Sequence, residues 1–326
     1  MTALLDGFGR SIEYLRISVT DRCNFRCLYC MPVAGLEWLP RSAILSYEEI
    51  ARVVRELSTL GLRRIRITGG EPTIRPGLHV LVGLLSDIDS IDDISLSTNG
   101  TRLREVASEL RRAGLDRVNI SVDSLRPDRI RSIARRNLDF DPIAAATAAE
   151  EAGLSPIKLN VVVMRGVNDD ELIDLARLTF EHNWHVRFIE LMPVGDLRAL
   201  TWEHVVPSDE VLDRLGTLGG LTPFAAPARS NGPARYYRFA GARGSIGVIT
   251  PMSHTYCASC NRVRLTADGR LRTCLFGDDE VDLRTPLRAG QRLEPYFRAA
   301  LASKPKEHGL LQMRVGGLKA LSQVGG

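Results

Sequence analysis

Six cysteines are the residues of this 326-residue chain whose spacing points most directly to chemistry. They form two groups of three, and no cysteine lies outside them. The first group is Cys23, Cys27 and Cys30, and the second is Cys257, Cys260 and Cys274. Iron–sulfur clusters and structural zinc ions usually take four protein ligands, so each group leaves one coordination position for something other than protein. An open coordination position at each metal centre indicates that a small molecule can bind there, so we expect both centres to be reactive.

Two other interpretations of the cysteines deserve comparison. His254 lies three residues before Cys257 and could complete a structural zinc site at the second group. No histidine lies near the first group. A disulfide framework is disfavoured, because an oxidised secreted scaffold more often has an even number of cysteines per unit and a signal peptide.

Elements that could position these cysteines alternate along the first 190 residues. The helical segment SYEEIARVVRELSTLG has a capping box at Ser46 and Glu49 and ends at Gly61, and Asn168 and Glu171 are placed as cap partners of a later helix. Six strand-then-helix units predict a parallel sheet covered by helices, either an open doubly wound sheet or an incomplete barrel. Strands are expected at Ile12 to Val19 and in RRIRITGG, DDISLSTNG, DRVNISVDS, IKLNVVVM and HVRFIELMP.

The polar motifs follow the predicted strands. In both architectures ligands bind at the carboxyl ends of the strands. The first cysteine group follows the first strand, GGEP the second, STNG the third and SVDS the fourth, which predicts one site on one rim. Beyond Pro193 the alternation fades into PFAAPARSNGPAR, strand-like YYRFAG and GSIGVIT, and a helix expected around Leu293 to Ala302.

Composition limits the class of protein. The chain is 44% apolar and carries a formal charge of +4, and it lacks both a signal-like start and an apolar run long enough for a membrane, so we expect a cytoplasmic globular protein. Runs such as REVASELRRAG are typical of solvated helix faces, so nucleic-acid binding does not follow from the charge. With 39 arginines and four lysines, Lys158 in IKLNVVV indicates a position that requires a compact cation.

The spacing Cys23-x3-Cys27-x2-Cys30, with Tyr29 and the downstream GGEP, resembles the signature of radical S-adenosylmethionine (SAM) enzymes. TDRCNFRCLYCMP, RITGGEP and CASCNRVRLTADGRLRTC resemble the GTP 3',8-cyclase family of molybdenum cofactor biosynthesis, from about Tyr14 to Leu275 and at the terminal glycines. The resemblance implies an α/β fold, an incomplete (β/α)6 TIM-like barrel in residues 1–230. It also implies a C-terminal extension, residues 231–326, that carries a second iron–sulfur cluster and covers the substrate.

The resemblance implies two [4Fe-4S] clusters, one on each cysteine group, with SAM on the open iron of the first. Reductive cleavage of SAM would give a 5'-deoxyadenosyl radical, so the cofactor supplies the difficult chemistry and no side chain is assigned as catalytic. The SAM-binding residues it implies are Tyr29, Gly70, Ser121 and Met192.

The implied substrate is GTP, and the product is 3',8-cyclo-7,8-dihydro-GTP. The chain has no phosphate-binding G-x-x-x-x-G-K-[ST] loop, so fixed cations must hold the triphosphate. Arg16 and Arg66 could instead form internal salt bridges, and either Ser97 or Thr98 could supply the hydroxyl group. The residues that the resemblance places around GTP are Arg16, Arg66, Ser97, Lys158, Arg262, Val263 and Arg264.

Further expectations concern partners. The resemblance implies a reductant protein or small-molecule electron donor, cyclic pyranopterin monophosphate synthase downstream, and a terminal Gly325-Gly326 pair that reaches into the site. We expect no nucleic acid and no membrane, and leave a homodimer open. The rival functions are a radical SAM peptide-modifying enzyme with an auxiliary cluster and a zinc-stabilised nucleic-acid-binding protein.

Overall fold

The computed structural model describes residues 4–192, 200–226, 232–277, 279–309 and 320–325. Within these residues, twelve strands form one sheet in the order β12-β11-β10-β1-β2-β3-β4-β5-β6-β9-β8-β7. The eight central strands are parallel. They are β10 (Arg262–Leu265), β1 (Tyr14–Ser18), β2 (Arg64–Thr68), β3 (Asp93–Thr98), β4 (Arg117–Ser121), β5 (Ile157–Val163), β6 (His185–Glu190) and β9 (Ser245–Ile249).

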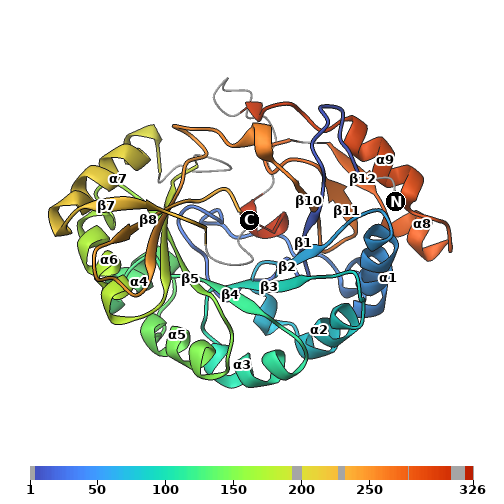
Figure 1. Ribbon diagram of the computed structural model, residues 1–326. Helices are drawn as coiled ribbons and strands as arrows, with labels where there is room; N and C mark the ends of the chain where they lie inside the picture. The colour runs from blue at the N-terminus through green and yellow to red at the C-terminus, as the bar shows by residue number, and fades with distance from the viewer. Residues whose placement is uncertain (1–3, 193–199, 227–231, 278, 310–319, 326) are drawn as a thin grey trace.

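Antiparallel strands extend both ends of this parallel sheet. At one end are β11 (Arg270–Arg272) and β12 (Glu280–Asp282), and at the other are β8 (Arg235–Phe239) and β7 (Leu221–Phe224). The sheet curves into an arc whose edge strands, β7 and β12, do not pair with each other (Figure 1). The predicted incomplete barrel is therefore confirmed.

Helices cover the outer side of the arc (Figure 1), whereas a doubly wound sheet would carry them on both faces. Between the strands of the barrel lie α1 (Tyr47–Ser58), α2 (Leu78–Ser86), α3 (Leu103–Arg112), α4 (Pro127–Ala134), α5 (Pro142–Glu151), α6 (Leu172–Glu181) and α7 (Ser208–Leu215). The C-terminal region adds α8 (Arg284–Arg288) and α9 (Glu294–Ala302), the second of which confirms the helix expected around Leu293 to Ala302.

Helix α1 begins and ends as its sequence predicts. The Ser46 hydroxyl accepts from the Glu49 backbone N–H at 3.1 Å, and the Glu49 carboxylate accepts from the Ser46 N–H at 2.8 Å. Gly61 follows the helix with a φ of 108°, which few other residues tolerate. A capping box of this kind stabilises a helix by about 1 kcal/mol.

The cap predicted at Asn168 and Glu171 was wrong. Asn168 instead accepts from the Met164 N–H at 2.8 Å and donates to the Asp123 carbonyl at 2.8 Å. The Glu171 carboxylate accepts from the Leu125 N–H at 2.8 Å. Both side chains join the loops after β4 and β5, because buried loop N–H groups need acceptors as much as a helix terminus does.

The parallel strands have a polar inner side and an apolar outer side. Arg16 pairs with Arg66 on one neighbouring strand and with Arg264 on the other, and all three line the cavity inside the arc. Ile17 and Ile67, one position further along, belong to the hydrophobic core instead. Side chains alternate along a strand, so the outer residues form this core with the helices while the inner residues line a site.

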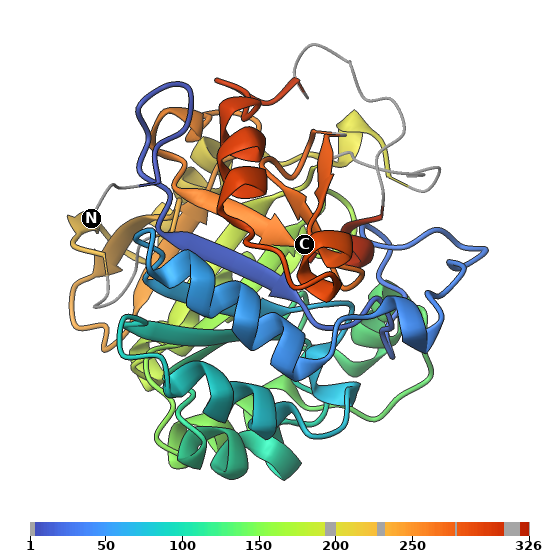
Figure 2. The same ribbon diagram turned by 90° about the vertical axis from the view of Figure 1, so that its right-hand side faces the viewer.

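The C-terminal strands complete the same sheet. β9 pairs with β6, and β10 pairs with β1, the first strand of the chain. Figure 2 shows an orange strand of the late part of the chain beside the blue strand β1, as the pairing of β10 with β1 requires. The boundary between residues 230 and 231 stays a prediction. In the part of the chain that the structure describes, no helix is both long and apolar enough to cross a membrane.

Candidate active site

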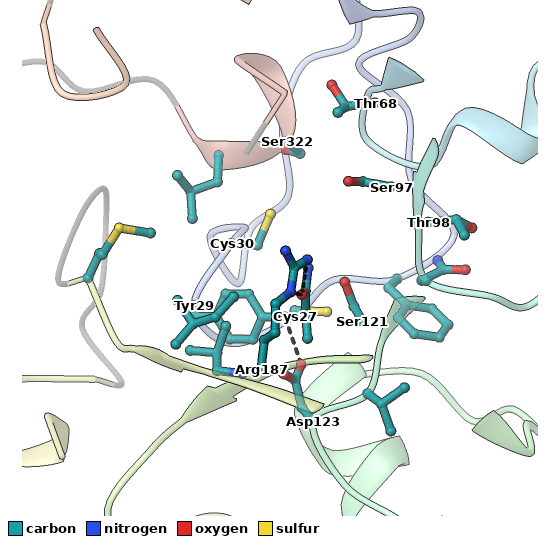
Figure 3. Close-up of a pocket in the computed structure, with 18 of the residues that line it drawn as sticks. Cys27, Tyr29, Cys30, Thr68, Ser97, Thr98, Ser121, Asp123, Arg187 and Ser322 are labelled. Carbon is teal, nitrogen blue, oxygen red and sulfur yellow. Dashed lines mark hydrogen bonds between the residues drawn. The ribbon is translucent and has the colours of Figure 1, made fainter. Parts of the chain in front are cut away.

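A cavity of about 270 Å³ lies inside the curve of the sheet. Figure 3 shows Cys27 and Cys30 on one side of it, with Ser97, Ser121 and Arg187 reaching in from the strands. The structure brings most of the predicted site residues to this one cavity. Those that line it are Arg16, Cys23, Cys27, Tyr29, Cys30, Arg66, Gly70, Ser97, Ser121, Met192, Arg262 and Arg264.

The loop with the first cysteine group, residues 19–32, is held by the GGEP motif. The Gly70 N–H donates to the Thr20 carbonyl at 2.7 Å, and the Glu71 N–H donates to the Arg22 carbonyl at 2.8 Å. A Cβ on Gly70 would lie 2.1 Å from the Arg22 carbonyl oxygen. Gly70 is therefore required for the two loops to pack, besides the SAM contact predicted for it.

The other side of this loop rests on the end of α4. The Arg26 N–H donates to the Ala134 carbonyl at 2.8 Å, and the Leu28 N–H donates to the Ile133 carbonyl at 3.0 Å. The Arg135 guanidinium donates to the Met31 carbonyl at 3.0 Å. The loop after β2 and the end of α4 thus both hold the loop of the first cysteine group.

The three thiols of the first group are free and face the cavity. Burial, together with the nearby Glu71 carboxylate, raises the pKa of Cys23 to about 12, and burial raises the pKa of Cys30 to about 11. Such thiols become thiolates only when a cationic metal centre stabilises them. The residues therefore fit a metal centre that has three cysteine ligands and faces the cavity.

Across the described residues, no group of three or more His, Cys, Asp or Glu side chains is close enough to hold a single metal ion. A single zinc ion would need its sulfur ligands about 4 Å apart, since each Zn–S bond is about 2.3 Å. In an iron–sulfur cluster the thiolates bind different irons, so their sulfurs lie further apart. His254, the fourth ligand of the zinc alternative, contacts Asp209 Oδ2 at 3.2 Å.

Asp123 is a site residue that sequence reasoning missed. The Tyr29 hydroxyl donates to Asp123 Oδ2 at 2.7 Å, and the Val162 N–H donates to Oδ1 at 2.9 Å. Burial raises the pKa of Asp123 to about 6. Asp123 follows Ser121 by two residues in SVDS, and that alternation was the signal that could have placed it on the inner face.

Two of the predicted SAM contacts lie at the ends of strands. Ser121 is the last residue of β4, and Met192 follows β6 by two residues. Met192, like Leu321, packs against the buried Met252 and lines the cavity. Both positions are open to a ligand that reaches the carboxyl ends of the strands.

Ser97 and Thr98 differ in what their hydroxyl groups already contact. The Thr98 hydroxyl donates to Glu71 Oε1 at 2.7 Å and accepts from the Gly100 N–H at 3.0 Å. Ser97 points into the cavity from the inner face of β3 (Figure 3). The geometry therefore favours Ser97 as the hydroxyl available to a substrate.

A group of interior cations occupies the inner face of the strands: Arg16, Arg66, Lys158, Arg187 and Arg264. Lys158 lines a small second cavity together with Arg66 and Arg187, which also line the main one. Burial, with Arg187 and other arginines nearby, lowers the pKa of Lys158 to about 5. Burial likewise lowers the pKa of Arg66 and of Arg264 to about 10. A bound anion would relieve this accumulation of charge.

Arg187 is a second residue that the sequence reasoning missed. Its guanidinium donates to Asn160 Oδ1 at 2.9 Å and to Asn119 Oδ1 at 2.7 Å. A Cβ on Gly247 of β9 would lie 2.9 Å from Arg187 Cγ, so this glycine leaves room for the arginine. A lone arginine in the apolar run HVRFIE was the available signal, as it was for Arg16 in YLRIS.

The second cysteine group lies at the opposite end of the parallel strands from the first. Cys257 and Cys260 precede β10, whereas the first group follows β1, and β1 and β10 are parallel neighbours. The antiparallel strand β11 then brings Cys274 back to the same end. Burial would raise the pKa of Cys260, but Arg262 and Lys304 lower it.

The second group approaches the cavity through its neighbours. Tyr256, Arg262 and Leu275 line the cavity, and Arg262 lies over the Tyr256 ring, 5.0 Å from its centroid. Val263 is buried in the hydrophobic core, so its predicted GTP contact remains a prediction and would have to come from its backbone.

The C-terminal residues enter the same space. Arg264 donates to the Gly325 carbonyl. Gly325 has a φ of 68°, and a Cβ there would lie 2.5 Å from Thr68 Oγ1. Its predicted partner Gly326 lies outside the described residues. Gly325 thus lies against Arg264 of β10 and Thr68 of β2, two residues that line the cavity.

Comparison with known proteins identifies the family. Residues 17–179 match the radical SAM superfamily, and residues 184–310 match Molybdenum Cofactor Synthesis C. The GTP 3',8-cyclase of Desulforamulus reducens is 48% identical over 330 residues, covering 99% of this chain and 100% of that protein. The chain belongs to the GTP 3',8-cyclase family. A family member from Moorella thermoacetica is also 48% identical, with 98% of this chain and 99% of that protein covered.

A solved structure of quite different sequence shares the fold. Streptococcus suis SuiB bound to S-adenosylmethionine has a TM-score of 0.63 and 14% identity, covering 94% of this chain and 72% of SuiB. At that identity the similarity shows the fold alone. This chain therefore shares its fold with a protein of quite different sequence, and fold alone does not fix function.

Proposed function

We propose that this chain converts GTP to 3',8-cyclo-7,8-dihydro-GTP in the first step of molybdenum cofactor biosynthesis. The observation that carries the proposal is one cavity that joins three metal-binding thiols at one end of the strands to buried cations on their inner face. Membership of the GTP 3',8-cyclase family supports the same reaction. A peptide substrate has no comparable need for buried cations.

The six cysteines would hold two [4Fe-4S] clusters. Cys23, Cys27 and Cys30 would hold the first, with SAM as its remaining ligand, and the second cysteine group would hold the other. When bound, the first cluster and SAM supply the one-electron chemistry that begins a radical reaction. Tyr29, Gly70, Ser121 and Met192 all line the cavity near this end and are the proposed SAM contacts.

The interior cations would bind the triphosphate. Arg16, Arg66 and Arg264 are neighbours across three strands, so their guanidinium groups can contact one phosphate chain together. Lys158 adds a compact cation and Arg262 another at the level of Tyr14. Ser97 and the backbone of Val263 are the remaining proposed contacts. Fixed donors of this kind orient the nucleotide without rearranging when it reacts.

The C-terminal segment would help to exclude water. Leu321 and Ser322 line the cavity, and Val324 is buried beside them. Radical reactions require that competing hydrogen donors stay out, and a covered cavity meets that requirement. A barrel in residues 1–230 with a covering region in residues 231–326 is part of this proposal.

The remaining expectations are proposals of the same kind. A reductant protein or small molecule would supply electrons, and cyclic pyranopterin monophosphate synthase would consume the product. A cytoplasmic location belongs to the same proposal, because in a reducing compartment clustered cysteines are more often metal ligands than disulfides.

Anaerobic reconstitution tests the proposed function. The chain is loaded with iron and sulfide and incubated with SAM, dithionite and either GTP or ATP. We expect 5'-deoxyadenosine and a cyclised nucleotide in the reaction with GTP but not in the reaction with ATP. The Cys27→Ser variant should give neither product with either nucleotide. GTP that stays intact while a different substrate drives SAM cleavage would assign the chain to another radical SAM reaction.

A further inference from the structure

Lys304 is a buried lysine at the second cysteine group. Its side chain is 3% exposed although lysine is among the residues least often buried. The ammonium nitrogen lies 3.6 Å from Cys260 Sγ and donates to the carbonyls of Arg262 at 3.0 Å and Thr273 at 2.5 Å. Each contact is with a cysteine ligand or with a residue within two positions of one.

Helix α9 delivers this lysine. Phe297 and Leu301 are buried where the helix packs against β11 and β12, and the helix ends at Ala302. The Lys304 N–H still donates to the Leu301 carbonyl at 3.2 Å, so the side chain leaves the helix in a fixed direction. An element distant from both cysteine segments in sequence thereby supplies a cation to them.

The contacts of Lys304 join two separate arms of the cysteine group. Cys260 precedes β10 and Cys274 follows β11, and these two strands are antiparallel partners. The carbonyl of Arg262 belongs to the first arm, and the carbonyl of Thr273 belongs to the second. One ammonium group with three donors can therefore fix the separation of the two arms.

Arg10 forms a parallel contact from the N-terminal region. Its guanidinium donates to the Cys257 carbonyl at 2.7 Å and to the Pro305 carbonyl at 2.7 Å. Asp6 pairs with the same guanidinium at 2.5 Å. Arg10 thus connects the Cys257 arm to the segment that carries Lys304.

We propose that Lys304 is a positioning residue of the second cysteine group, which holds its two arms at the separation a cluster requires and places a fixed positive charge beside the Cys260 sulfur. This inference rests on the proposed function, in which that group holds a [4Fe-4S] cluster. A fixed cation favours the reduced, more negative cluster, and hydrogen bonds to the sulfurs act in the same direction. Lys304 therefore raises the reduction potential of the second cluster.

The test isolates the second cluster in the full-length chain by changing Cys23, Cys27 and Cys30 to alanine. Iron and sulfide content and an anaerobic redox titration followed by electron paramagnetic resonance are measured with and without Lys304→Met. In Lys304→Met we expect the equilibrium constant for one-electron reduction of the cluster to fall at least tenfold, which lowers its reduction potential by about 59 mV, or we expect the folded chain to lose iron. Circular dichroism establishes that the chain is folded.

Two further variants complete the experiment. Lys304→Arg keeps a cation and is expected to restore most of the lost potential or iron. Lys306→Met changes an exposed lysine two residues away and is expected to change neither. If Lys304→Met has the same iron content and reduction potential as Lys306→Met, the inference about Lys304 is overturned while the proposed function stands. Absence of any cluster from the second group in the parent chain would contradict the proposed function instead.

Discussion

At the scale of single residues, the site is made by charges placed in otherwise apolar strands. Arg16, Arg66 and Lys158 could be picked out from the sequence because each interrupts an apolar run. Arg187 has the same pattern, but its partners come from strands β4 and β5, and the Tyr29 partner of Asp123 comes from the cysteine loop. Which strands are neighbours is a property of the folded sheet, so those contacts could not be predicted.

The lowered pKa of Lys158 leads us to expect that the protein takes up a proton when GTP binds. Its pKa, lowered to about 5 by burial and by Arg187 and other arginines nearby, leaves it mostly neutral at pH 7 before substrate binds. A triphosphate beside it raises that pKa, so affinity for GTP falls as pH rises from about 5 to the pKa in the complex. Calorimetry in buffers of different ionisation enthalpy measures the proton taken up.

Lys158→Met is expected to abolish this proton uptake and weaken GTP binding by roughly 10- to 100-fold, since a hydrogen bond to a charged group is lost. The matched control is Lys306→Met, which changes an exposed lysine. Equal proton uptake by Lys158→Met and the parent chain would show that another group titrates.

At the scale of elements, the alternation of strands and helices was readable, and so was the capping box of α1. The caps assigned to Asn168 and Glu171 failed because a local motif cannot reveal that a side chain is used by a loop 45 or 46 residues away in sequence. The paired loops after β1 and β2 show the same limit. GGEP suggests a turn, whereas its closest neighbour is the backbone of the cysteine loop.

Gly70→Ala tests how those two loops fit. A Cβ there would collide with the Arg22 carbonyl, so the cysteine loop must shift and the first cluster is expected to lose most of its iron. The second cluster should remain, giving about half the iron of the parent chain by elemental analysis. Gly83→Ala is the control, because a Cβ at this helical glycine meets nothing within 4 Å. Full iron content in Gly70→Ala would mean that the loops can separate without cost to the cluster.

At the scale of the whole molecule, the sequence predicted six strand-helix units and one rim of motifs. It could not show that β9 and β10 extend the barrel at both ends, since strand pairing over such separations leaves no local pattern. The location of the second cysteine group at the other end of the strands follows only from the direction of β10. A single site therefore depends on both halves of the chain.

Removal of Gly325 and Gly326 tests the contribution of the chain end. Arg264 loses its contact with the Gly325 carbonyl, and we expect cyclisation of GTP to be abolished while both clusters remain bound. Gly325→Ala, whose Cβ would press on Thr68, should reduce turnover in the same direction. Gly220→Ala, a position with open space around it, serves as control. Normal turnover by the shortened chain would rule out this role.

The pairing of β1 with β10 has a consequence for synthesis on the ribosome. β1 gains its neighbour β2 early, but its other edge has no partner until Arg262–Leu265 has emerged. An unpaired strand edge attracts other chains, so the nascent barrel is exposed to misassociation for most of its translation. Slow elongation late in the message would therefore lower the yield of folded protein more than slow elongation early.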